Sequence, residues 1–182
     1  MAEKNKTKLW LVLERIARLR VAVGFFVALV AFLLAEPSWH SVVVGIAIAS
    51  CGESLRVWAA GHIRKGQEVT TSGPYSLTRH PLYLGSFVIG VGFVWAAGSA
   101  VVAILVASYL LVMLWVATTV EEAALRESFG TEYDRYRRGQ FERSRRRFSL
   151  SQVMQNGEHR TLIGFILVLG LLLLKVWLSA GS

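Results

Sequence analysis

A short polar segment between two long apolar runs carries residue types suited to binding a charged small molecule. The segment Gly73–Gly85 combines helix breakers, aromatic rings, a cation and an imidazole. Within it, Pro81 suits the first turn of a helix, where its missing N–H costs nothing. The free N–H groups at such a helix start attract carboxylates. The segment therefore predicts one half of a binding site for a ligand that carries an acidic group.

Two neighbouring carboxylates, Glu121 and Glu122, offer the other half of that site. They follow the apolar run Val101–Val120, and a turn of only three residues joins this run to Leu82–Ala97. Such a short connection makes the two runs antiparallel neighbours. We therefore expect His80 to lie close to both carboxylates. Anion-binding donors facing carboxylates form a receptacle for a zwitterionic amino-acid group.

Each of these side chains also has an ordinary structural interpretation. Glu122 has the spacing to pair with a cation one turn along a solvated helix. Arg79 can simply anchor the chain at the membrane surface. His80 has no second His at ligand spacing, so we expect it to form hydrogen bonds and predict no metal site. Glu53 and Arg56, three residues apart inside an apolar run, either neutralise each other or contact a substrate.

The elements that must position these residues are apolar helices. Of the 182 residues, 54% are hydrophobic, and they occur in long blocks, which is typical of a membrane protein. We predict an all-α integral membrane bundle with about five transmembrane helices. A surface amphipathic helix over Met1–Arg20 precedes them. The predicted spans are Val21–Ala35, Trp39–Ala60, Leu82–Ala97, Val101–Val120 and Leu162–Leu178.

The distribution of Lys and Arg predicts the orientation of the bundle. Of the 20 Lys and Arg, six lie in residues 1–20, three in 61–80 and nine in 121–160. The positive-inside rule then places these three segments in the cytoplasm. Five spans put the C-terminus outside. We expect an inner or plasma membrane protein with a cytoplasmic active site.

Three regions follow from this layout. Residues 1–60 hold the surface helix and two spans, residues 61–148 the site and the hairpin, and residues 149–182 a linker and the last span. We expect Glu121–Phe148 to continue the fourth helix into water. The basic run Arg143–Arg147 fits anionic headgroups better than nucleic acid, so membrane lipids are expected partners and nucleic acid is not. The sequence makes no prediction of oligomeric state.

Four motifs, taken together and in order, resemble the isoprenylcysteine carboxyl methyltransferase family, in the broader group that includes phospholipid methyltransferases. The similar stretch runs from Gly61 to Arg143, and the span at Leu162–Leu178 follows it. The motifs are Glu68–Tyr75, Arg79–Gly85, Glu121–Glu122 and Phe129–Tyr136.

The resemblance implies an integral membrane enzyme that uses S-adenosylmethionine from the cytoplasm and a lipid-like or prenylated substrate from the bilayer. Roles in methyl transfer are predicted for Arg143, Glu122 and Arg79. The predicted cofactor contacts are Tyr75, His80, Pro81, Leu82, Tyr83, Gly85, Glu121 and Glu122. The predicted substrate contacts are Tyr133, Tyr136 and Arg143, to which the intramembrane charges add Glu53 and Arg56.

The methyl acceptor stays open, with a carboxylate favoured. A carboxylate, with a pKa of about 4, is already ionised and needs only positioning and a cation, Arg143 or Arg79. An amine or thiol must first lose a proton, for which Glu122 and Glu53 are candidate bases. Two alternatives remain: an NADPH-dependent membrane reductase of the sterol-reductase type, and a membrane scaffold without enzymatic activity.

Overall fold

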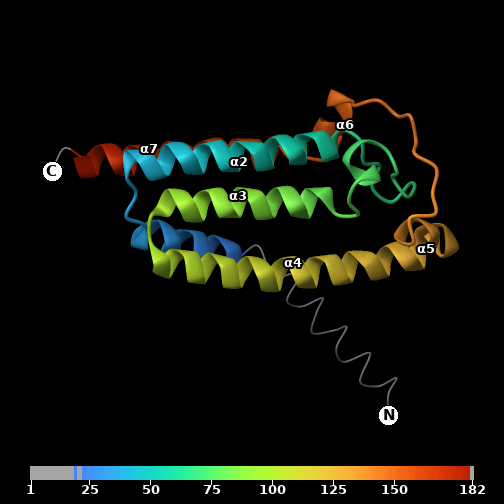
Figure 1. Ribbon diagram of the computed structural model, residues 1–182, viewed down its shortest axis with the longest axis horizontal. Coiled ribbons are helices and arrows are strands. Elements are labelled where there is room, and N and C mark those ends of the chain that lie inside the picture. The colour runs from blue at the N-terminus through green and yellow to red at the C-terminus, as the bar shows by residue number, and fades with distance from the viewer. Residues whose placement is uncertain (1–18, 20–21, 181–182) are drawn as a thin grey trace, which may run out of the picture.

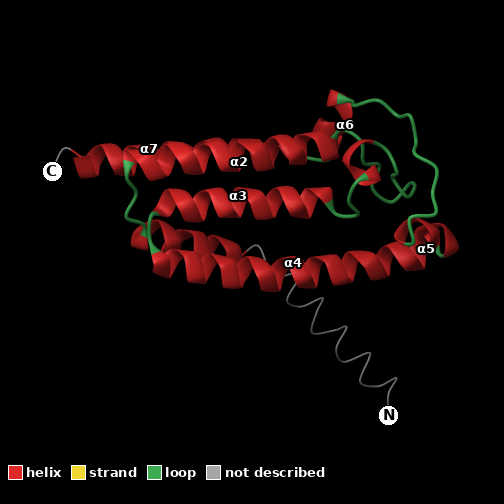
Figure 2. Cartoon of the chain, in the orientation of Figure 1, coloured by secondary structure: helices red, strands yellow, loops and turns green. Residues whose placement is uncertain are grey.

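The protein is a bundle of helices that run side by side along one long axis (Figure 1). The computed structural model describes Leu19 and residues 22–180. All regular elements within these residues are helical, and Figure 2 shows most of the loops gathered at one end of the bundle. The predicted amphipathic helix Met1–Arg20 lies, apart from Leu19, outside the described residues.

Three helices of the described chain are long and apolar enough to cross a membrane, which needs about 20 residues. They are α2 (Trp39–Ala60), α4 (Ala100–Phe129) and α7 (Glu158–Ala180). Two apolar helices are shorter: Ala22–Leu34 and α3 (Pro81–Ala97). The chain is therefore a helical membrane protein, whereas the prediction of about five spans stays a prediction for the two shorter helices.

Glycines hold α2 and α3 in close contact. A Cβ at Gly45 would lie 2.5 Å from the carbonyl oxygen of Gly92. One at Gly52 would lie 2.7 Å from the carbonyl oxygen of Gly85. Small residues allow helix backbones to approach in a membrane, where packing drives helix association. This seam fixes the first turn of α3 against the second half of α2.

The predicted hairpin of α3 and α4 is confirmed. Gly98 ends α3 with a φ of +63°, which favours glycine, and α4 begins at Ala100. The N–H of Glu36 donates to the carbonyl oxygen of Ala97 at 2.8 Å, which ties the preceding turn to this one. The start of α3 and the end of α4 consequently lie at the same end of the bundle (Figure 1).

The predicted continuation of α4 is only partly correct. The helix does extend past the apolar run, to Phe129, but Gly130 ends it with a φ of +50°. A short helix α5 (Thr131–Arg137) follows, and Gly139 has a φ of +74°. The helix predicted through Phe148 is therefore wrong beyond residue 137, because two glycines with positive φ, Gly130 and Gly139, interrupt it.

Residues 138–149 instead form an extended strap that lies against the loop of residues 61–80. The Thr71 hydroxyl donates to the carbonyl oxygen of Glu142 at 3.0 Å, and the Ser149 N–H donates to that of Gly61 at 3.1 Å. A short helix, α6 (Leu150–Gln155), then leads into α7, where only a linker was expected. The strap thus closes the loop end of the bundle.

Candidate active site

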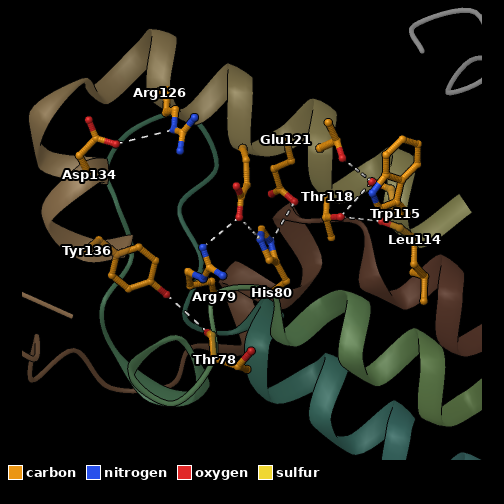
Figure 3. Close-up of polar contacts among 12 residues, drawn as sticks. Thr78, Arg79, His80, Leu114, Trp115, Thr118, Glu121, Arg126, Asp134 and Tyr136 are labelled. Carbon is orange, nitrogen blue, oxygen red and sulfur yellow. Dashed lines mark hydrogen bonds and ion pairs between the residues drawn. The ribbon is translucent and has the colours of Figure 1, made fainter. Parts of the chain in front are cut away.

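The corner that precedes α3 meets the end of α4, as predicted. His80 directs Nδ1 toward Glu121 Oε2 at 3.7 Å and Nε2 toward Glu122 Oε1 at 3.3 Å. Arg79 Nη1 donates to the same Glu122 oxygen at 3.1 Å. Figure 3 shows Arg79 and His80 reaching from their loop toward α4, with the His80 ring directed at Glu121. One guanidinium, one imidazole and two carboxylates therefore form one network across the hairpin.

The charge of His80 depends on its surroundings. Burial lowers the pKa of the imidazole, but the hydrogen bonds and negative charges of Glu121 and Glu122 outweigh burial and raise it above its ordinary value. The two carboxylates therefore stabilise the charged imidazole relative to the neutral one.

A cavity of about 310 Å³ opens beside this network, at the lower end of the range of ligand pockets, about 300–1,000 Å³. We call it the polar cavity. Segments far apart in the sequence meet around it: α2, the 61–80 loop, α3, α4 and α7. Its lining consists of Arg56, Lys65, Tyr75, Arg79, His80, Pro81, Leu82, Tyr83, Glu121 and Glu158.

A second lobe of about 230 Å³ adjoins the polar cavity and shares Lys65, Tyr75, Arg79 and Glu121 with it. Helix α5 contributes two tyrosines to this lobe, Tyr133 and Tyr136. The Tyr136 hydroxyl donates to the carbonyl oxygen of Tyr75 at 2.7 Å. Helix α5 is thereby attached to the loop that carries the cavity wall.

Two buried hydroxyls of these linings, those of Tyr75 and Tyr133, have no hydrogen-bond partner among the described residues. Buried polar groups are nearly always paired, so the two hydroxyls favour a polar ligand in the second lobe, which both residues line. Burial raises the pKa of Tyr133 to about 12, and it also raises that of Tyr75. Both groups are therefore hydrogen-bond donors at neutral pH and not bases.

A different cavity, of about 270 Å³, lies among the apolar helices. We call it the apolar cavity. The helix Ala22–Leu34, α3, α4 and α7 surround it, with side chains that include Ala28, Phe32, Phe93 and Leu110. Ser86 of α3 belongs to its lining too. Its walls suit a hydrocarbon chain.

Arg56 connects the elements around the polar cavity. Its Nε donates to Glu158 Oε1 at 2.6 Å, and Nη1 donates to the Ser86 hydroxyl and to the carbonyl oxygen of Leu82. The expected pairing with Glu53 is weaker, since Nε lies 4.0 Å from Glu53 Oε2. Both Glu53 oxygens are buried without a hydrogen bond from the described residues. Glu158 is therefore the main partner of Arg56.

The structure gathers most of the predicted site residues. Those that line the polar cavity are Tyr75, Arg79, His80, Pro81, Leu82, Tyr83, Glu121 and Arg56, while Tyr133 and Tyr136 line the second lobe. Glu122 binds Arg79 and His80 from beside the cavity.

Three predicted residues lie elsewhere. Gly85 is buried in the contact between α2 and α3, where an added Cβ would lie 2.5 Å from Arg56 Cγ. Arg143 is exposed in the strap, and Glu53 lines a separate groove beside α7.

Sequence reasoning missed two residues of the lining, Lys65 and Glu158. Glu158 had one usable signal, because an acidic residue at the start of an apolar helix is costly to bury without a partner. Lys65 lies in an irregular loop, and no pattern pointed to it. The described residues contain no group of three side chains that could hold a metal ion.

Comparisons with known proteins match the part of the chain that carries most of these residues. A family model described as phospholipid methyltransferase matches residues 39–132. The chain is 32% identical over 137 residues to the nickel-cobalt-cadmium resistance protein NccN of Alcaligenes xylosoxydans xylosoxydans, 69% of this chain and 62% of that protein. It is 34% identical over 93 residues to the cobalt-zinc-cadmium resistance protein CzcN of Cupriavidus metallidurans, 43% of this chain and 41% of that protein.

A third relative is an enzyme. The chain is 32% identical over 92 residues to the protein-S-isoprenylcysteine O-methyltransferase of Schizosaccharomyces pombe, 50% of this chain and 39% of that protein. The chain thus spans less than two thirds of each of these relatives. No solved structure matches it.

Proposed function

The chain belongs to the phospholipid methyltransferase family, and we propose that it is a membrane methyltransferase that moves a methyl group from S-adenosylmethionine to a lipid-like acceptor. The observation that carries this proposal is the pair of cavities. A polar cavity fits the charged donor, and an apolar cavity next to it fits a hydrocarbon chain. Their linings contact each other through the hydrogen bond between Arg56 and Ser86.

The residues of the polar cavity fit the donor. Glu121 suits the ammonium or the ribose hydroxyls, and the free N–H groups at the start of α3, with Lys65, suit the carboxylate. The unpartnered hydroxyls of Tyr75 and Tyr133 offer further donors. When bound, S-adenosylmethionine supplies a methyl group whose bond to sulfur breaks as the acceptor's lone pair forms the new bond.

An isoprenylcysteine-type carboxylate is the acceptor that we favour. It is ionised at neutral pH and requires no base. A cation must align it, and Arg79 lines the polar cavity whereas Arg143 is exposed in the strap. We therefore give this role to Arg79. Glu122 is the candidate base if the acceptor is an amine, although Arg79 and His80 already bind it.

We also propose that the polar cavity faces the cytoplasm. The loop of residues 61–80 and the segment 121–160 carry most of the cationic side chains outside the N-terminal region. The positive-inside rule places such segments on the cytoplasmic side. Helix α7 would then end on the outer side of an inner or plasma membrane.

Transfer of a labelled methyl group tests this function. Purified protein in nanodiscs is incubated with methyl-labelled S-adenosylmethionine and either a lipid extract or a synthetic S-farnesylcysteine acid. We expect label in the lipid fraction. Gly90→Leu, which adds volume to the lining of the apolar cavity, should lower transfer about tenfold or more while donor binding persists.

Gly170→Leu is the matched control, since a Cβ at Gly170 would meet nothing within 4 Å among the described residues. Its transfer rate should equal that of the wild type. The proposal fails if no lipid and no acid acquires label. If NADPH raises the unfolding temperature of the protein and S-adenosylmethionine does not, the result would instead indicate a reductase.

A further inference from the structure

The junction of the two cavities is formed by a contact between helices. Ser86 lines the apolar cavity, Arg56 lines the polar cavity, and Arg56 Nη1 donates to the Ser86 hydroxyl. This inference rests on the proposed function, in which the donor occupies the polar cavity and the hydrocarbon chain of the acceptor occupies the apolar cavity. The reacting ends of both must then meet at this contact, so the donor's sulfur faces Arg56.

Helix α7 determines where Arg56 lies. Glu158 Oε1 accepts from Arg56 Nε at 2.6 Å, and the Thr161 hydroxyl lies 3.4 Å from Nη2. Glu158 is 5% exposed and lines the polar cavity itself. Both α7 residues lie beyond residue 132, where the match to the family ends. A helix outside the matched region therefore supplies part of the cavity wall.

The charge of this wall matters because the donor carries a positive sulfur. A lone guanidinium would repel that sulfur strongly, since charges interact more in a partly buried site than in water. Glu158 neutralises Arg56 directly, and Glu53 Oε2 also lies 4.0 Å from Arg56 Nε. The remaining charged groups of the lining are Lys65, Arg79, His80 and Glu121.

We propose that the Arg56–Glu158 ion pair forms the wall of the donor site that faces the sulfonium, and that Glu158 of α7 makes this wall tolerant of a positive charge. Arg56 then holds Ser86 and the first turn of α3 in place without repelling the donor. Removing the charge of either member would then change the affinity for the positively charged donor more than the affinity for the neutral product.

The affinities for S-adenosylmethionine and S-adenosylhomocysteine test this proposal, because the two ligands differ only by a methyl group and its charge. The readout is the ratio of their dissociation constants, donor over product, from calorimetry in detergent. Glu158→Gln leaves the wall one charge more positive and should raise the ratio about tenfold. Arg56→Gln leaves it one charge more negative and should lower the ratio by a similar factor. A purely structural role would not move the two ratios in opposite directions.

Further variants keep the test decisive if one of these misfolds. Thr161→Asp retains the ion pair and adds a negative charge beside Arg56, so it should lower the ratio. Thr161→Val and Glu127→Gln, the latter an exposed carboxylate on α4, should leave it unchanged. Variants that still bind S-adenosylhomocysteine are folded.

The inference is overturned if the ratio stays within about twofold of the wild-type value in the charge variants that bind the product. If the wild type binds neither S-adenosylmethionine nor S-adenosylhomocysteine, that result contradicts the proposed function itself and not only this inference.

Discussion

The two cavities of this protein are built by different means. The walls of the polar cavity come from separate segments that charged contacts hold together, such as Arg79 with Glu122 and Arg56 with Glu158. The apolar cavity lies between helices whose facing residues are small, aliphatic and aromatic. Changes in charge or hydrogen bonding should therefore affect donor binding first, whereas changes in helix packing should affect both cavities.

Crowding the α2–α3 seam should have the largest effect, because the seam supports both cavities. In Gly92→Leu the new Cβ would lie 2.6 Å from the backbone nitrogen of Ala49, which cannot move aside as a side chain could. We expect a loss of about 3 kcal/mol in the free energy of unfolding, at the upper end for overpacking. Unfolding in mixed detergent micelles measures it. Gly170→Leu is the control, and equal stability of the two variants would contradict the close seam.

Removing one hydroxyl from α5 should have a smaller effect, confined to the polar side. Tyr136→Phe leaves the buried carbonyl oxygen of Tyr75 without its donor at 2.7 Å. We expect a cost of about 1–2 kcal/mol in stability and weaker binding of S-adenosylhomocysteine. Thermal unfolding and calorimetry measure the two quantities. An unchanged affinity for S-adenosylhomocysteine would show that ligand binding in the second lobe does not depend on this hydrogen bond.

The smallest effect should come from pH. The pKa of His80 is raised in the folded protein, so its ion pairs stabilise the fold fully below about pH 6.5, the value for an unfolded His. This stabilisation is lost as the pH rises through the higher folded pKa. Such partly exposed pairs contribute about 1 kcal/mol or less. The unfolding temperature between pH 6 and 9 should fall more in the wild type than in His80→Gln. Parallel curves would exclude the pairing.

The sequence predicted the elements that follow local rules. Trp39–Ala60 has the predicted bounds, and Pro81 begins α3 as its fixed φ allows. A short turn forces a hairpin, so the proximity of His80 to Glu121 followed from topology alone. These features depend on neighbouring residues or on one tight connection.

Features that depend on distant packing were not predictable in the same way. Arg56 and Glu158 are 102 residues apart, and their pairing requires α7 to pack against α2 in one register. The i, i+3 spacing suggested Glu53 as the partner, but tertiary packing gave Arg56 a closer one. The strap likewise depends on Gly130 and Gly139, whose positive φ values end helices that the charge pattern favoured.

Binding of S-adenosylhomocysteine tests the central claim, that the polar cavity is the donor site. Calorimetric titration of the wild type should show saturable binding of one equivalent. His80→Ala and Glu121→Ala each remove a side chain that lines the polar cavity, and these variants should lose binding while remaining folded. Gly90→Leu, in the lining of the apolar cavity, should retain binding. No binding to the wild type, or full binding by both polar-cavity variants, would contradict the account.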